Sequence, residues 1–98
     1  MKPSDGLSPT DTVASSETAL STTLDGEAVI LETESGTYYG LNEVATHVWE
    51  RLDEQQTIAD LRDSVLAEYD VEQERVEHDL EAVLADMAEN GLVEIGRE

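Results

Sequence analysis

The chain has 98 residues, enough for one small domain, and 39% of them are hydrophobic, enough for a modest core. It carries 24 acidic and 5 basic residues, so its formal net charge at pH 7 is −19. Because duplex nucleic acid is bound mainly through Lys and Arg, we expect no nucleic-acid partner. The chain contains no cysteine, which excludes a disulfide framework and any thiolate metal site.

Neither a signal peptide nor a membrane span is recognisable in the sequence. The N-terminus lacks the basic-then-apolar pattern of a signal peptide, and no stretch approaches ~20 apolar residues. We therefore expect a cytoplasmic protein with no membrane partner. The acidity has three interpretations: solubility, a halophile-like adaptation to high salt, or a binding face for a basic partner. The even spread of charge disfavours the third.

The first residues of the chain, 1–17, are rich in Ser, Thr, Asp, Gly and Pro and have no apolar period. This composition predicts a disordered tail. The remainder, residues 18–98, is predicted to form the folded domain.

After this tail we predict a three-stranded antiparallel meander. Asp25-Gly26 is a strong two-residue hairpin signal, and Ser35-Gly36 supplies a second turn. Sequential hairpins place the strands side by side in chain order, so the third strand lies at an edge of the sheet. The strands are expected at residues 19–24, 27–33 and 37–41.

Three helices are predicted to follow the meander, with Asn42, Thr57 and Asp70 as their N-caps. Asn90-Gly91 ends the third helix, and residues 92–95 are a candidate final strand. Each helix carries an apolar stripe at helical spacing. The stripes are Val44, Ala45, Val48, Trp49 and Leu52; Ile58, Leu61, Val65, Leu66 and Tyr69; and Val76, Leu80, Val83, Leu84 and Met87. This order predicts an α+β fold of the winged helix-turn-helix type.

No catalytic site is predicted. The sequence contains no Gly-x-Ser-x-Gly elbow, Gly-rich phosphate loop or Cys/His pair, and 24 acids form carboxylate pairs by chance. His47 and His78 are isolated and are predicted to be surface residues, since a zinc site needs several converging ligands. We therefore expect no enzyme activity, no metal and no cofactor.

Ser64, within Asp63-Ser64-Val65, has two interpretations. Small acidic helical carrier proteins attach phosphopantetheine to a serine in an Asp-Ser-Leu motif, where the serine begins a helix. Ser64 falls inside a predicted helix, which favours an ordinary solvent-facing serine. The strand meander also does not suit an all-helical carrier.

The third predicted strand, 37–41, is the most informative segment. Proteins usually protect an edge strand with Lys, Pro or inward charges, and this strand has none of them. Such an edge can accept a peptide as an added strand. Alternation places Tyr39 and Leu41 on the face toward the helices and Tyr38 on the other. The alternative is that both tyrosines are ordinary strand residues, because tyrosine has a high strand propensity.

The order of several short motifs resembles the PqqD-like family over about residues 18–95. The matching motifs are Gly26-Glu27-Ala28-Val29, Gly-Thr-Tyr-Tyr-Gly-Leu-Asn at 36–42, Val48-Trp49, Thr57, Tyr69-Asp70, His78-Asp79-Leu80 and Asn90-Gly91-Leu92-Val93. The chain is most similar to the stand-alone members that accompany lasso-peptide leader peptidases. The very acidic surface and the long polar N-terminus depart from the family pattern.

The resemblance implies a RiPP recognition element. Such a protein binds the leader segment of a ribosomally synthesised precursor peptide and presents it to a modifying enzyme such as a leader peptidase. The leader is expected to add as a strand to the third strand, in a groove against the third helix. The partners implied are therefore a precursor leader and a leader peptidase or another modifying enzyme.

Placed on this sequence, the resemblance implies a leader-binding site made of the third strand and of residues on and beside the stripe of the third helix. Val83 and Met87 would form an apolar wall, while Asp79 and Asp86 would hold a basic or polar leader side chain or would simply be solvated. Trp49 is predicted to be a core residue. The full set is Thr37, Tyr38, Tyr39, Gly40, Leu41, Asp79, Val83, Asp86 and Met87.

Three alternative functions stay open from the sequence. One is a PqqD-type peptide chaperone for a radical SAM maturase. The second is an acidic carrier-type domain modified at Ser64, and the third is a winged-helix regulator acting through protein contacts. We expect a monomer or a weak edge-strand dimer, since an open edge can also pair with its own copy.

Overall fold

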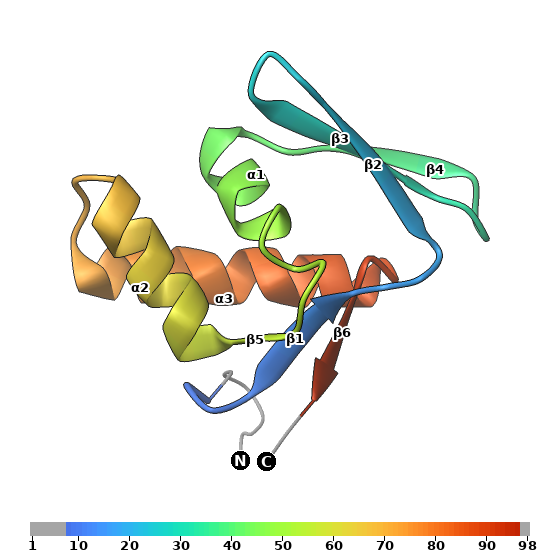
Figure 1. The fold of residues 1–98 in the computed structure, drawn as a ribbon. Helices are drawn as coiled ribbons and strands as arrows, with labels where there is room; N and C mark the ends of the chain where they lie inside the picture. Colours follow the sequence, from blue (N-terminus) through green and yellow to red (C-terminus); the bar gives the residue numbers. More distant parts are fainter. Residues whose placement is uncertain (1–7, 97–98) are drawn as a thin grey trace.

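The structure, a computed structural model, describes residues 8–96. In that part of the chain, three helices lie between two antiparallel three-stranded sheets (Figure 1). The predicted α+β class is therefore confirmed. The elements are β1 (Thr12–Ser15), β2 (Ala19–Leu24), β3 (Glu27–Glu32), β4 (Thr37–Gly40), α1 (Glu43–Trp49), β5 (Gln56–Thr57), α2 (Ile58–Glu68), α3 (Gln73–Glu89) and β6 (Val93–Gly96).

The predicted meander is present, with strand order β2-β3-β4. Asp25 and Gly26 both have positive φ, 54° and 82°, as a tight two-residue hairpin requires. On β3, Ala28 and Ile30 are fully buried and face the helices. The meander therefore closes one side of the core and leaves β4 at its edge.

A second sheet, of order β5-β1-β6, corrects the predicted tail. Val13 of β1 lies opposite Gln56 and Ile95 and is fully buried. The prediction of disorder over residues 1–17 is therefore wrong for residues 8–17, while residues 1–7 lie outside the described residues. The pairing with β6 joins segments about as far apart as the chain allows, and local composition carries no sign of it.

The first two helix caps are as predicted. The Asn42 Oδ1 accepts a hydrogen bond from the Ala45 N–H at 2.9 Å, and the Thr57 Oγ1 accepts one from the Asp60 N–H at 3.1 Å. Each bond satisfies one of the N–H groups that the first helical turn leaves without a partner. These caps fix the directions in which α1 and α2 leave the sheets.

The predicted cap of the third helix is wrong, whereas its predicted end is confirmed. Glu72 stands at the N-cap position in place of Asp70, and its side chain makes no capping hydrogen bond. Residues 70–72 are instead used to connect α2 to α3. At the other end Asn90 is the C-cap, followed by Gly91 with φ 78°.

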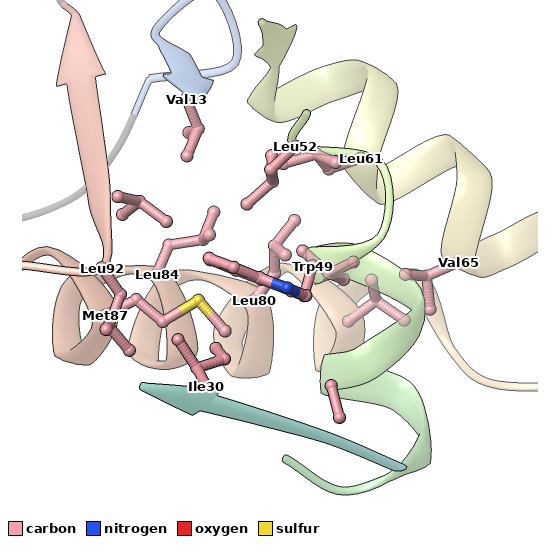
Figure 2. Packing of buried hydrophobic residues seen from close by; sticks show 14 residues of the cluster. Val13, Ile30, Trp49, Leu52, Leu61, Val65, Leu80, Leu84, Met87 and Leu92 are labelled. Atoms are coloured by element: carbon pink, nitrogen blue, oxygen red, sulfur yellow. The ribbon is translucent and has the colours of Figure 1, made fainter. Parts of the chain in front are cut away.

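The core fills the space between the two sheets and the helices. Trp49 is only 7% exposed, as predicted, and its Nε1 donates to the Ser21 Oγ at 2.9 Å. Figure 2 shows Ile30, Trp49 and Met87, from three different elements, directed into the same interior. The largest fully buried side chains are Ile30, Leu52, Leu61, Leu84, Leu92 and Val13. No helix within residues 8–96 is both long enough and apolar enough to span a bilayer.

Candidate functional site

Strand β4 is the edge of its sheet and pairs with β3 alone among residues 8–96. Its other edge is left with unpaired backbone groups. Tyr39 and Leu41 are half-buried and packed against the core, whereas Tyr38 is 69% exposed, which confirms the predicted alternation. Leu41 extends the ladder beyond the strand, since its N–H donates to the Ala28 carbonyl at 2.9 Å.

A buried carboxylate holds the turn that leads into β4. Glu32 is only 5% exposed, and it accepts hydrogen bonds from the Thr18 Oγ1 at 2.5 Å and from the Ser35 N–H at 2.8 Å. The Thr18 bond, followed by the bonds from the turn, holds the pKa of Glu32 below its ordinary value of 4.5. The β3–β4 hairpin is therefore fixed at its closed end by an ionised side chain.

One hydrogen bond links β4 to the C-terminal end of α3. The Tyr39 hydroxyl donates to the Asn90 Oδ1 at 3.2 Å, and the Asn90 Nδ2 donates to the Asp86 carbonyl at 2.8 Å. Asn90 therefore couples the edge strand to the last turn of the helix. The α3 residues on the N-terminal side of this link, from Arg75 to Val83, border an open part of the surface.

A surface groove of about 630 Å³ lies there, between α1, the α2–α3 connection and α3. We call it the α1–α3 groove. Its walls are largely apolar, and Val44 and Val71 on its sides are 42% and 44% exposed. It begins at Asn42, two residues after the end of β4. Its lining residues are Asn42, Val44, Ala45, Val48, Val65, Tyr69, Asp70, Val71, Glu72, Arg75, Val76, Asp79, Leu80, Ala82 and Val83.

Only two of the four α3 residues that were predicted for the site line the groove. Asp79 and the half-buried Val83 line the groove. Asp86 is exposed but lies outside the lining, and Met87 is only 3% exposed. The prediction that Met87 forms an accessible apolar wall is therefore wrong, because this turn of α3 packs into the core under the sheet.

Sequence reasoning missed the contributions of α1 and of the α2–α3 connection. Val44 was assigned to the core stripe of the first helix, yet its position in the first helical turn leaves it exposed to the groove. Val71 stands between Asp70 and Glu72 and belongs to no helical stripe. The sequence did contain a signal for this wall: Val71 is apolar, belongs to no helical stripe and lies between two acidic residues.

Carboxylates dominate the rim of the groove. Asp70, Glu72 and Asp79 lie there with one cation, Arg75, which pairs with Asp79 at 3.5 Å. Both partners of this pair are mostly exposed, so the pair contributes little to stability. The groove thus combines an apolar interior with a negative border.

His47 is buried, which corrects its prediction as a surface residue. It is 8% exposed, its Nε2 lies 2.7 Å from the Ser64 Oγ, and its ring meets Tyr69 edge-on with 5.4 Å between the ring centroids. Burial lowers the pKa of His47 from its ordinary value of 6.5, and the positive charge of Arg51 lowers it further. His78 is exposed, as predicted.

Ser64 is part of this helix contact and does not face solvent freely. It is half-buried in the middle of α2, where its hydroxyl is hydrogen-bonded to His47 of α1. The prediction of a solvent-facing serine is therefore wrong. A modified serine must be reachable by the modifying enzyme, and a mid-helix hydroxyl engaged with a buried ring offers less access than a serine at a helix start.

A second hollow of about 410 Å³ lies at the β2–β3 turn. It is polar, and carboxylates from the turn and from α1 surround it. The residues that line it are Asp25, Gly26, Glu27, Glu43, Thr46, His47, Glu50 and Tyr69. Within the described residues, no group of three or more His, Asp and Glu side chains is placed to hold a metal ion.

The fold and the site define a small α+β domain of the winged-helix type, in which the open edge strand β4 runs into an apolar groove. Comparison with known families makes the assignment specific. The family described as "Coenzyme PQQ synthesis protein D (PqqD)" matches residues 27–93, which is more than half of the chain. The chain belongs to this family. A comparison with curated protein sequences finds no match.

Two solved structures resemble most of this fold. The first, "TbiB1 in Complex with the TbiA(beta) Leader Peptide", is 34% identical with a TM-score of 0.78, covering 83% of this chain and 94% of that chain. The second, "Lasso peptide synthetase B1 complexed with the leader peptide", is 28% identical with a TM-score of 0.73, covering 84% and 96%. Both are complexes with leader peptides.

Proposed function

We propose that this chain is a non-catalytic RiPP recognition element of the lasso-peptide type. It binds the leader segment of a ribosomally synthesised precursor peptide and presents that segment to a modifying enzyme, such as a leader peptidase. One observation carries the proposal: the open edge of β4 leads directly into the apolar α1–α3 groove. Its likeness to two leader-bound structures over most of its length supports the same conclusion.

The proposed binding mode is strand addition. The leader pairs with the backbone groups of Thr37 to Leu41, and alternate leader side chains then face the helices. An apolar leader side chain enters the α1–α3 groove between Val44 and Val71. The carboxylates of the rim favour a leader that carries basic or polar residues beside this apolar one.

The outer face of the meander supports the second half of the proposal, presentation to an enzyme. Leu20, Leu24 and Tyr38 are 59%, 62% and 69% exposed, and strand register places all three on the face turned away from the helices. Half-buried Leu31 and Val29 lie on the same face. We call these five residues the outer sheet face. Contiguous apolar patches are uncommon on the surface of single domains and mark interaction sites. In a chain with a net charge of −19, we therefore infer that a partner covers the outer sheet face.

The test of leader binding is a titration with a synthetic peptide that has the leader sequence of the precursor encoded beside this chain's gene. We expect saturable binding, with amide NMR shifts concentrated in residues 37–41 and 70–83. Shifts centred on the β5-β1-β6 sheet would contradict the proposed site. The same titration can use the TbiA(beta) leader as a second probe, given the 34% identity of its partner.

A matched pair of variants separates the groove from general surface effects. Val71→Glu puts a charge into the exposed apolar wall, and we expect leader affinity to fall at least ~10-fold, or about 1.4 kcal/mol. Leu24→Glu makes the same change at an exposed leucine outside the groove lining and should leave leader affinity within about twofold. Equal effects of the two variants would argue against the groove.

Two alternatives have direct tests of their own. A PqqD-type chaperone would bind a radical SAM maturase in place of a leader peptidase, and pull-down with each enzyme distinguishes the two partners. A carrier domain would have phosphopantetheine on Ser64, which intact-mass spectrometry detects. Our proposal expects no such modification, because the Ser64 hydroxyl is engaged with His47.

A further inference from the structure

The closed end of the β3–β4 hairpin lies against the C-terminal end of α3. The helix ends at Asn90, and Gly91 follows with φ 78°. A Cβ at Gly91 would lie 3.9 Å from the Glu32 Cγ, which is ordinary van der Waals contact. Glu32 in turn holds the turn before β4, since it accepts from the Ser35 N–H at 2.8 Å. Strand and helix are therefore in close contact at this end.

A hydrogen bond joins β4 to α3 at the same end. The Tyr39 hydroxyl donates to the Asn90 Oδ1 at 3.2 Å, and the Asn90 Nδ2 donates to the Asp86 carbonyl at 2.8 Å. We call these two bonds the strand–helix link. The backbone after Asn90 is also fixed, because the N–H of the buried Leu92 donates to the Met87 carbonyl at 2.9 Å. The amide of Asn90 is thus held in place from both sides.

The other end of β4 is open. There the α1–α3 groove begins at Asn42, with the exposed Val44 on its side. Tyr39 and Leu41 both face the helices, and successive positions on one face of a strand lie roughly 7 Å apart. A strand that adds to β4 therefore has one inward position beside Leu41 and the groove, and another beside Tyr39 and the strand–helix link.

Backbone pairing alone does not fix the register of an added strand, because its N–H and C=O groups are alike at every residue. A slip of one residue exchanges the two faces of the strand, whereas a slip of two residues preserves them. Competing registers thus differ by two residues, and the space beneath the strand must select among them. A large apolar side chain over the strand–helix link would break its bonds or leave polar atoms buried without partners, which is unfavourable.

We propose that the strand–helix link is a register stop for the leader, and that Asn90 is the positioning residue, acting through Tyr39. The link admits a small or polar leader side chain beside Tyr39. A large apolar side chain is admitted beside Leu41, where the groove opens. This inference rests on the proposed function. It adds a requirement on the leader: a large apolar residue and a small or polar residue two positions apart on one strand.

The test uses the full chain and a synthetic leader with the sequence of the precursor encoded beside its gene. Each position of the leader strand is replaced in turn by Leu, and every peptide is titrated against the wild type and against Asn90→Ala. At one inward position, we expect Leu to weaken binding to the wild type ~10-fold. Asn90→Ala should reduce that penalty to within about threefold, because the shorter side chain removes the link and leaves room.

The ratio of two affinities separates positioning from a merely structural role. If Asn90 only supports the fold, Asn90→Ala weakens every peptide by the same factor and the penalty for Leu stays unchanged. Tyr39→Phe removes the hydroxyl but keeps the ring that packs against the core, and it should relax the same leader position. If Asn90→Ala does not fold, Tyr39→Phe decides the question. Glu89→Ala changes an exposed neighbour of Asn90 and should keep the wild-type penalty.

The register itself can be observed with a nitroxide label at one end of the leader. In the wild type we expect paramagnetic broadening of one set of amides along β4. In Asn90→Ala the broadening should extend to amides two residues further along the strand. Unchanged broadening together with an unchanged penalty for Leu would overturn the register stop while leader binding stands. A leader that does not bind the wild type at all would instead overturn the proposed function.

Discussion

His47 is the residue that joins α1 to α2 behind the groove. Its ring is buried, its Nε2 lies 2.7 Å from the Ser64 Oγ, and its edge meets Tyr69, which lines the groove. Several charges surround it: Glu43 on its own helix, Glu50 and Arg51 just after the end of that helix, Glu68 on α2, and Asp25 and Glu27 at the β2–β3 turn. Burial outweighs the acidic neighbours and keeps the neutral form favoured.

A pH dependence of stability follows from this burial. The pKa of His47 is lower in the folded chain than its ordinary value of 6.5, so the unfolded chain binds the proton more readily. Its contribution to stability is therefore fully present above about pH 6.5 and is lost as the pH falls through the folded pKa. We expect the wild type to lose thermal stability between pH 7.5 and 5.5.

Histidine variants identify the residue responsible. His47→Gln, whose amide can still bond Ser64, should flatten the dependence between pH 7.5 and 5.5, measured by thermal unfolding. His78→Gln changes an exposed histidine of the same chain and should retain the wild-type slope. If both variants keep that slope, another group is responsible.

Individual residues also show which buried positions could be predicted from the sequence and which could not. The apolar stripes correctly placed Trp49 in the core, because helical period and residue type agree. His47 was misplaced because it lies beside a stripe, where only the partner element decides whether a side chain is covered. Met87 was rightly placed in the apolar stripe of the third helix, but the further expectation that it forms an accessible wall was wrong, because its side chain is only 3% exposed. For His47 that partner is Ser64 of α2, and for Met87 it is the sheet.

At the scale of elements, α3 is the helix with the least satisfied start. Its N-cap, Glu72, makes no side-chain capping bond, whereas Asn42 and Thr57 each cap their helix. Asp70 looked like a cap because Gln73 follows three residues later. Residues 70–72 form the connection that reverses the chain between the packed helices α2 and α3. A four-residue capping motif gives no indication of this connection.

A shorter acidic side chain at position 72 should improve the N-capping of α3. Glu72→Asp places a carboxylate at the length that can accept from the first free N–H groups of α3, and it keeps the charge favourable to the helix dipole. We expect the free energy of unfolding to rise by about 0.5–1 kcal/mol in urea titration. As a reference, Asn42→Ala should lower it by about 1 kcal/mol. A loss of stability in Glu72→Asp would mean that the Glu72 side chain contributes a contact beyond the cap.

The edge strand was predicted correctly because its signals are local. Two turn motifs define the strand, and an alternating pair of tyrosines defines its faces. The groove next to it could be predicted only in part. Its walls come from α1, α3 and the connection between α2 and α3, so they depend on how helices pack and not on any one motif.

At the scale of the whole molecule, β1 ties together parts of the chain that are distant in sequence. The Ser15 N–H donates to the Leu52 carbonyl at 2.9 Å, and the Ser16 N–H donates to the Leu92 carbonyl at 2.9 Å. The Asp11 carbonyl accepts from the Ile58 N–H at 3.0 Å. One short segment thus holds the end of α1, the start of α2 and the turn before β6.

The prediction from sequence was least accurate for this strand, β1. Thr12–Ser15 is rich in small polar residues and has one large apolar side chain, so its composition is that of a linker. Strand pairing supplies what composition lacks: β1 is paired on both sides, with β5 and with β6. Long-range pairing of this type depends on the finished fold, and local patterns carry no trace of it.

The last prediction tests whether this segment belongs to the folded unit. Val13 is fully buried in the core cluster (Figure 2), so Val13→Ala should lower the free energy of unfolding by about 2 kcal/mol in urea titration. Thr10→Ala, at an exposed position just before the strand, should change it by less than about 0.5 kcal/mol. A disordered segment would make both variants neutral. A large loss from Val13→Ala alone would make residues 11–16 part of the same cooperative fold that holds β4 and the groove in place.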